Sequence, residues 1–324
     1  MKALIEAFAA DSDVQSVISG IRKGMREQMV SGLAGSSRQV FIAALEEALQ
    51  RPMLIVTHNM FSAQKIVEDL QECLSAEQVL LYPANELMAA EAAISSPETL
   101  AQRMDALTKL SSGFRGVVVV PFSGVRRYLP IAGVMAEAEL ALKVGDTLPM
   151  EDFLRRMTSL GYTRGDRVES KGEMSVRGGI VDFYPLTAAG AYRVEWFGDE
   201  IDSIRMFDPA DQRSTDQLNE CVIPPCQEIL ADAARMAAAA RHAEELLQRQ
   251  LDKMTDRTAK DRLRSEIGGE LEKLREQVYF PEIYKYIALL YPERQTIIDY
   301  MPEDTLLVLD EPTRLTETAR PLER

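Results

Sequence analysis

The 324-residue chain has few of the residue types that build metal centres, disulfide frameworks or membrane spans. It contains three cysteines and two histidines, and Cys221 and Cys226 lack the CxxC spacing of a structural zinc site. No stretch approaches the roughly 20 apolar residues that cross a bilayer, and the first ten residues lack the apolar core of a signal peptide. We therefore expect a cytoplasmic protein with reduced thiols, no bound metal and no membrane contact.

Basic residues are also scarce relative to acidic ones, and the formal net charge is −14 at pH 7. A surface of this sign repels phosphate at long range, which argues against autonomous, sequence-independent DNA binding. A local basic patch is compatible with this charge, although the overall field opposes it. With 46% hydrophobic residues, the chain is long enough for two globular domains with cores of their own.

The first third and the end of the chain alternate between apolar runs and helical patterns. Strands are predicted at residues 28–31, 53–56, 79–82, 116–120, 296–299 and 305–309, and helices at 12–27, 40–49, 62–74 and 98–110. Near-continuous Val, Leu and Ile strands separated by helices are typical of a parallel sheet that is covered on both faces. The fold class is therefore predicted to be α/β.

The middle of the chain has a different pattern. Between residues 140 and 207, short strands alternate with hairpin signals at Lys171-Gly172 and Gly198-Asp199, and one helix is expected over 150–160. Residues 228–277 are long-helical, with a break expected at Gly268-Gly269. The order predicts an α/β domain (1–130) that is interrupted by a smaller α+β insertion rich in antiparallel strands (131–208) and followed by helices and a return to the sheet (209–324).

Two segments invite a nucleotide-binding interpretation. Gly32-Leu-Ala-Gly-Ser-Ser-Arg-Gln39 begins like a phosphate-binding loop, in which Lys neutralises the phosphates and a hydroxyl ligates magnesium. Gly32 and Gly35 are present. However, Ser37 stands in place of the second glycine of the motif, Arg38 in place of its lysine and Gln39 in place of the residue whose hydroxyl ligates magnesium. The second segment is the apolar strand that ends in Asp310 and Glu311, as in the strand that holds magnesium in ATPases.

The magnitudes favour a degenerate nucleotide site. Each lost charged contact forfeits about 1.5–3 kcal/mol, so two losses weaken affinity on the order of a hundred- to ten-thousandfold. We expect no ATP or other cofactor here, no catalytic residue and no enzymatic activity. The rival hypothesis is a divergent P-loop ATPase in which Arg38 replaces Lys and Asp310 holds the metal. A third hypothesis is direct DNA contact by the α/β face.

A family resemblance comes from three segments at fixed spacing. They are Gly161-Tyr-Thr-Arg-Gly-Asp-Arg-Val-Glu169, Val176-Arg-Gly-Gly-Ile-Val-Asp-Phe-Tyr-Pro185 and Arg193-Val-Glu-Trp-Phe-Gly-Asp-Glu-Ile201. With the loop and Leu309-Asp310-Glu311, they resemble UvrB and the amino-terminal region of the transcription-repair coupling factors. The degraded loop favours the coupling factors, and so does the lack of aromatic residues over 83–97, where UvrB carries a DNA-wedging hairpin.

The resemblance implies a degenerate, UvrB-like, P-loop-NTPase-like sheet domain and an inserted domain that recruits UvrA in nucleotide excision repair. It also implies that RNA polymerase and DNA are bound, and ATP hydrolysed, by other regions of a longer protein. A UvrB-like domain that binds damaged DNA is the alternative.

Arginines in the inserted domain are the candidate UvrA contacts, because guanidinium groups pair with carboxylates in bidentate fashion and are common at interface hot spots. The alternative roles are structural: Phe183 is expected to fill the core, and Arg177 can pair with Glu169 across a hairpin. The candidate contacts are Arg164, Arg167, Arg177 and Phe183, with Tyr162 and Glu169 as supports.

Overall fold

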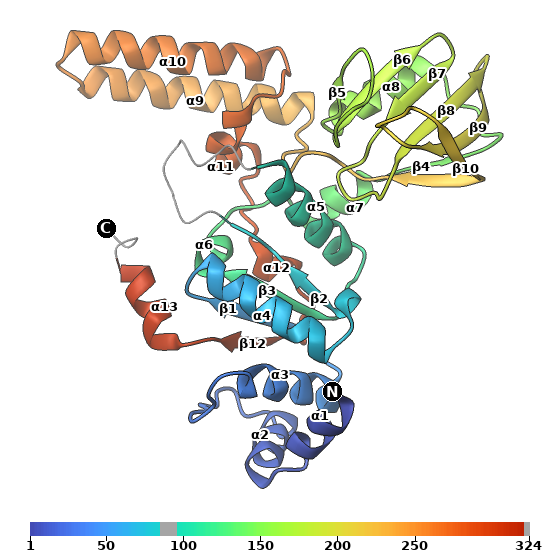
Figure 1. Ribbon diagram of the computed structural model, residues 1–324. Coiled ribbons are helices and arrows are strands. Elements are labelled where there is room, and N and C mark those ends of the chain that lie inside the picture. Colours follow the sequence, from blue (N-terminus) through green and yellow to red (C-terminus); the bar gives the residue numbers. More distant parts are fainter. Residues whose placement is uncertain (85–95, 321–324) are drawn as a thin grey trace. The chain divides into compact units, whose positions relative to one another are not determined.

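The computed structural model describes residues 1–84 and 96–320, and its chain divides into two compact units (Figure 1). Unit 1 comprises Met1–Met88, Ser112–Arg127 and Thr296–Arg324, and unit 2 comprises Ala89–Ser111 and Tyr128–Gln295. The chain therefore leaves unit 1 and returns to it twice. Of the aromatic-free segment at 83–97, residues 85–95 lie outside the described residues.

A four-stranded parallel sheet is the centre of unit 1, with the order β12-β1-β3-β2. The two central strands are buried at every position, which explains their unbroken apolar sequence. The strands are β1 (Met53–Thr57), β2 (Val79–Leu81), β3 (Val117–Pro121) and β12 (Leu306–Leu309). The predicted parallel α/β sheet is confirmed.

Helices cover this sheet. Apolar side chains of α3 and α4 pack on the face formed by Met53, Ile55, Val117 and Val119, while α6 contacts β1 and β3. The helical elements are α1 (Lys2–Ala9), α2 (Ser12–Arg22), α3 (Ser37–Leu49), α4 (Met60–Cys73), η1 (Ala76–Gln78), α6 (Phe122–Val125), α12 (Ile297–Tyr300) and α13 (Pro312–Ala319).

Two strands predicted for unit 1 are wrong. Residues 28–31 form no strand, and Met29 and Val30 are exposed there. Residues 296–299 begin α12 instead, because Thr296 and Asp299 form a capping box that satisfies the first free N–H groups of a helix.

A six-stranded sheet forms most of the inserted region in unit 2, with the order β10-β9-β8-β7-β6-β5. All neighbours are antiparallel except β5 and β6. Its strands are β5 (Thr163–Arg164), β6 (Glu173–Arg177), β7 (Ile180–Phe183), β8 (Ala191–Phe197), β9 (Glu200–Phe207) and β10 (Ser214–Leu218). A second, two-stranded sheet pairs β4 (Leu140–Lys143) with β11 (Glu220–Ile223), and α8 covers Met150–Ser159. The strands therefore continue past residue 208, where the sequence placed the end of the insertion.

One of the two predicted hairpins is correct. The β8–β9 hairpin turns at Gly198-Asp199, as expected. The hairpin at Lys171-Gly172 is wrong, because β5 lies further back in the chain and pairs with β6 in parallel. The next hairpin instead joins β6 to β7 through Gly178-Gly179, where Gly178 adopts a φ of +61° that favours glycine.

The remaining helices of unit 2 are α5 (Pro97–Ser111), α7 (Ala132–Glu137), α9 (Ala233–Lys253), α10 (Arg257–Arg275), η3 (Pro281–Tyr286) and α11 (Ile287–Leu290). Helices α9 and α10 lie side by side as a two-helix arm (Figure 1). The arm turns at 254–256, where Asp256 caps α10, and the break expected at Gly268-Gly269 is wrong. These glycines lie inside α10, which Leu271 and Leu274 anchor to the apolar core around α9.

Candidate docking face and degenerate loop

The loop in unit 1 has the glycine conformations of a phosphate-binding loop but not its setting. Gly32 and Gly35 adopt positive φ angles of +85° and +57°, and α3 begins at Ser37. The Ser37 hydroxyl donates a hydrogen bond to the carbonyl of Ala34 at 2.7 Å. A phosphate-binding loop joins a strand to a helix, and here residues 28–34 provide no strand. The side chain of Gln39, at the position of the magnesium-binding hydroxyl, is buried.

Arg38 is held by the two carboxylates of the second motif. Its Nη1 lies 2.7 Å from Oδ1 of Asp310 and 3.4 Å from Oε1 of Glu311. Asp310 directly follows β12, and its N–H donates to the carbonyl of Val56 at 2.9 Å. The cation expected to face phosphate and the acids expected to hold magnesium are therefore paired with each other.

The first face of the six-stranded sheet is an aromatic core under α8. The ring of Phe183 lies 6.0 Å from that of Phe153 on α8 and 5.5 Å from that of Tyr192. Phe183 is fully buried, and Tyr162 is buried with its hydroxyl donating to the Pro224 carbonyl at 3.0 Å. Phe183 thus fills the core, which is its alternative role from the sequence, and the ring of Tyr162 packs against it at 6.2 Å.

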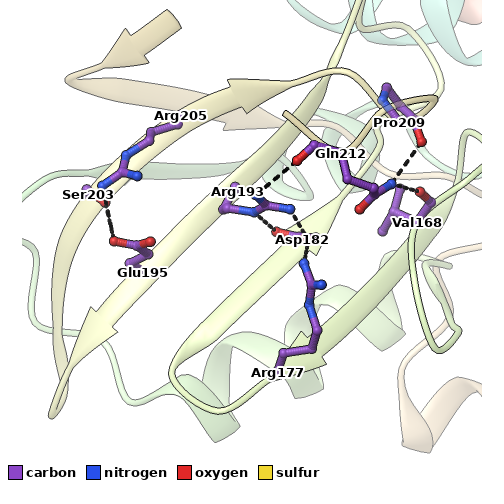
Figure 2. A network of polar contacts seen from close by, with 9 residues as sticks. All are labelled: Val168, Arg177, Asp182, Arg193, Glu195, Ser203, Arg205, Pro209 and Gln212. Carbon is purple, nitrogen blue, oxygen red and sulfur yellow. Dashed lines mark hydrogen bonds and ion pairs between the residues drawn. The ribbon is translucent and has the colours of Figure 1, made fainter. Parts of the chain in front are cut away.

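The opposite face carries a polar network centred on Asp182 (Figure 2). Asp182 is 1% exposed and accepts hydrogen bonds from Arg193 Nε and Nη2 at 2.7 and 2.9 Å and from Arg177 Nη2 at 2.7 Å. The hydrogen bond with Asp182 raises the pKa of Arg193 above its ordinary value. Arg177 keeps 51% of its side chain exposed. The pairing of Arg177 with Glu169 is wrong, because Glu169 pairs with Arg167 instead.

A second cluster lies next to this one on the same face. The strand register places Asp182, Arg193 and Arg205 in one row across β7, β8 and β9. In the adjacent row, Glu195 accepts hydrogen bonds from Ser203 Oγ at 3.1 Å and Arg205 Nη2 at 3.2 Å. On this face, charged side chains of neighbouring strands therefore pair with one another and fix one another's positions.

Arg164 lies on the other face of the sheet. It pairs with Met174 in the β5–β6 ladder, and residues paired in this way point to the same side, here towards α8. An open pocket of about 360 Å³ is found there, lined by Leu154, Arg155, Thr158, Tyr162, Arg164 and Met174. Arg164 and Arg177 thus occupy opposite faces at the β5–β6 edge, and a single partner can reach both only around that edge.

Sequence reasoning missed Asp182 and Arg193 as site residues. Asp182 interrupts the apolar run of β7, and an acid within a buried strand requires a cationic partner. That signal was present in the sequence, but the partner could be chosen only from the strand register.

No group of three or more His, Cys, Asp or Glu side chains in residues 1–84 and 96–320 is placed to hold a metal ion. Among the same residues, no helix has both the length and the apolar character that a membrane span requires.

Comparison with known proteins identifies relatives of the whole segment. Residues 140–228 match the family described as the UvrB interaction domain. The chain is 37% identical over 321 residues to the transcription-repair-coupling factor of Bacillus subtilis, covering 99% of this chain and 27% of that protein. Identity to the same factor of Staphylococcus aureus is 31% over 303 residues, and to that of Staphylococcus haemolyticus 30% over 304, each covering 92% of this chain and 25% of the relative. The chain spans about a quarter of the length of these curated relatives, and the resemblance predicted from the sequence is confirmed.

Proposed function

Because the chain is similar over nearly its whole length to transcription-repair-coupling factors, we propose that it is a non-catalytic docking module for transcription-coupled nucleotide excision repair. In this proposal the inserted β domain recruits UvrA to RNA polymerase stalled at damage. The observation that carries it is Arg177, which is half exposed and fixed by the buried Asp182 within the UvrB interaction domain.

The geometry suits a partner surface that presents carboxylates. Asp182 is already matched by the bidentate contact from Arg193, so the guanidinium of Arg177 retains a positive charge to offer. Its fixed position lowers the entropy lost on binding. Arg164 has no ion pair or side-chain hydrogen bond within the described residues, and it supplies a second cation at the same edge. UvrA would then approach along β5 and contact both arginines, with Arg167 beside them.

The proposed absence of nucleotide binding rests on the pairing of Arg38. A triphosphate would have to displace a guanidinium held 2.7 Å from Asp310, and a metal ion would have to compete for the same carboxylates. We assign unit 1 to a degenerate, UvrB-like, P-loop-NTPase-like sheet that binds no cofactor. ATP hydrolysis, the contacts with RNA polymerase and the DNA contacts of the motor would belong to other regions of a longer protein.

The docking assignment can be tested by measuring the Kd of UvrA for the 324-residue chain by surface plasmon resonance. Arg164→Glu and Arg177→Glu are each expected to weaken binding at least about tenfold, since each creates like-charge repulsion at a desolvated contact. Arg26→Glu is the matched control, because this arginine is exposed in unit 1 and lies outside the inserted domain. If both edge variants fold normally and bind UvrA within twofold of the parent, the docking surface is wrongly assigned.

Nucleotide binding is tested separately by calorimetry. Mg-ATP at millimolar concentration is expected to give no binding heat with the parent chain. Micromolar binding that Asp310→Asn abolishes would support the divergent ATPase instead.

A further inference from the structure

The far end of the α9–α10 arm carries a local excess of positive charge in an acidic chain. Residues 249–264 hold six Lys or Arg residues and three Asp residues, a net of +3, while the whole chain carries −14. The cations are Arg249, Lys253, Arg257, Lys260, Arg262 and Arg264. We call residues 249–264 the arm tip.

The acids of the arm tip are already engaged. Asp256 accepts the N–H groups of Thr258 and Ala259 at 2.8 and 3.3 Å as the cap of α10, so its charge is directed to the helix end. Asp252 accepts from the Gln248 amide at 2.8 Å, and Asp261 lies 3.6 Å from Arg264.

Four of the six cations have no such contact. Within residues 1–84 and 96–320, no ion pair or hydrogen bond holds their side chains, so their charge faces solvent. They are Lys253, Arg257, Lys260 and Arg262.

The arm tip is also sterically accessible. At the base of the arm, Ala239, Ala243, Leu271 and Leu274 are buried against the segment that contains η3 and α11. Beyond the base, α10 packs along α9, and Leu251 of α9 is buried. Helix α9 has 21 residues, which corresponds to a length of about 31 Å. The basic end is thus presented by a stiff two-helix support (Figure 1).

We propose that the arm tip binds the phosphate backbone of duplex DNA. No large apolar side chain of residues 249–264 is exposed, the nearest being Leu246, so the surface lacks the apolar centre of a protein interface. It also contains no aromatic residue on which single-stranded bases could stack. A surface of unpaired cations that lacks exposed apolar and aromatic side chains fits duplex DNA, because the phosphate charges of a duplex lie on its outside. This inference does not depend on UvrA docking.

Salt dependence gives the proposal a quantitative form. Four phosphate contacts predict a slope of about −3.6 for log K against log salt concentration. Between 50 and 200 mM salt, affinity would then fall on the order of a hundredfold.

The experiment measures binding of the 324-residue chain to a fluorescent 30-base-pair duplex by anisotropy across this salt range. In the test variant, glutamine replaces Lys253, Arg257, Lys260 and Arg262. The control removes the same charge at four exposed positions outside the arm, namely Lys2, Lys23, Lys65 and Arg213. Circular dichroism confirms that both variants keep the helical content of the parent chain.

The parent and the control are expected to share the steep slope, whereas the test variant loses it. Equal losses in both variants would show that net charge alone is responsible, and absence of binding by the parent at 50 mM salt would also overturn the proposal. Poly-L-glutamate serves as a carboxylate polyanion. Equal competition by this polymer at matched charge would assign the arm tip to acidic protein surfaces instead of DNA.

Discussion

Replacing Asp182 with asparagine tests how the docking face is organised, that is, the face of the six-stranded sheet that carries Asp182, Arg177 and Arg193. Asn keeps the shape of the side chain but loses the charge, and its amide nitrogen becomes a donor that faces a guanidinium donor. The carboxylate of Asp182 is 1% exposed and accepts two hydrogen bonds from Arg193 and one from Arg177. We expect the free energy of unfolding to fall by about 2–4 kcal/mol, because a buried cation–carboxylate contact is broken from one side.

The two arginines should differ sharply in their share of this energy. Arg193 is 14% exposed, makes the bidentate contact and lies 4.7 Å from the centre of the Phe207 ring, so Arg193→Gln should cost about 2–3 kcal/mol. Arg177 is 51% exposed, and solvent screens its pair with Asp182. Arg177→Gln should therefore cost below about 1 kcal/mol.

Urea unfolding of the parent chain and of the three variants measures these free energies, with tryptophan fluorescence reporting on Trp196, the single tryptophan of the chain. Trp196 belongs to the inserted domain, where its ring lies 5.0 Å from that of Phe153. The double variant of Asp182→Asn with Arg193→Gln closes a mutant cycle that isolates the pair. The reasoning fails if Arg177→Gln destabilises the domain as much as Arg193→Gln does. It would then be Arg177 that anchors the sheet, and its loss could not be interpreted as loss of a docking contact.

Three further outcomes are expected. Arg103→Ala should lower the free energy of unfolding, measured in urea, by about 3–5 kcal/mol. Arg103 is 2% exposed and pairs with Glu228, which is 7% exposed and whose carboxylate would be left buried without a partner. A loss below about 1 kcal/mol would contradict this. Arg38→Ala should cost about 1 kcal/mol or less, because its side chain is 35% exposed, and a larger loss would mean that the pair with Asp310 is not screened. Burial raises the pKa of the Cys221 thiol to about 12 and that of Cys226 to about 11, so the unfolded chain releases these protons first. Stability should therefore fall as pH rises from about 9 to 12, by up to about 1.4 kcal/mol per pH unit for each thiol, and the alanine variants of both cysteines should flatten the curve between pH 8.5 and 10.

The sheets could be predicted where burial on both faces leaves an unbroken apolar run. Residues 53–57 and 117–121 are fully buried, and their sequences indicate central parallel strands without further information. Residues 296–299 have the same β-branched character but form a helix. There, a local capping box from Thr296 and Asp299 outweighs strand propensity, and Ile298 is left exposed.

The candidate site could be predicted in composition but not in arrangement. The arginines of the signature segments are surface cations, as the sequence indicated, yet alternation along β5 and β6 assigns Arg164 and Arg177 to opposite faces. Which acid fixes Arg177 depends on the register between β6 and β7, because a shift of one residue would turn Asp182 to the other face. Short turns such as Gly178-Gly179 set that register, and their hairpin partners are ambiguous in a single sequence.

An arginine paired with a carboxylate occurs at both candidate sites, and the balance of charges around each pair gives them opposite properties. At the loop, the carboxylates of Asp310 and Glu311 are matched by Arg38 and Arg314, so the cluster has no net charge to offer phosphate or metal. On the docking face, one carboxylate is shared by Arg177 and Arg193, which leaves a net positive charge on the more exposed side chain. Since an uncompensated and fixed charge is what attracts an acidic partner, the chemistry favours docking at the β domain and disfavours ligand capture at the loop. Arg193→Gln would remove the excess positive charge on the docking face, because Arg177 would then neutralise Asp182 alone. This substitution should thus weaken UvrA binding, even though Arg193 itself is nearly buried.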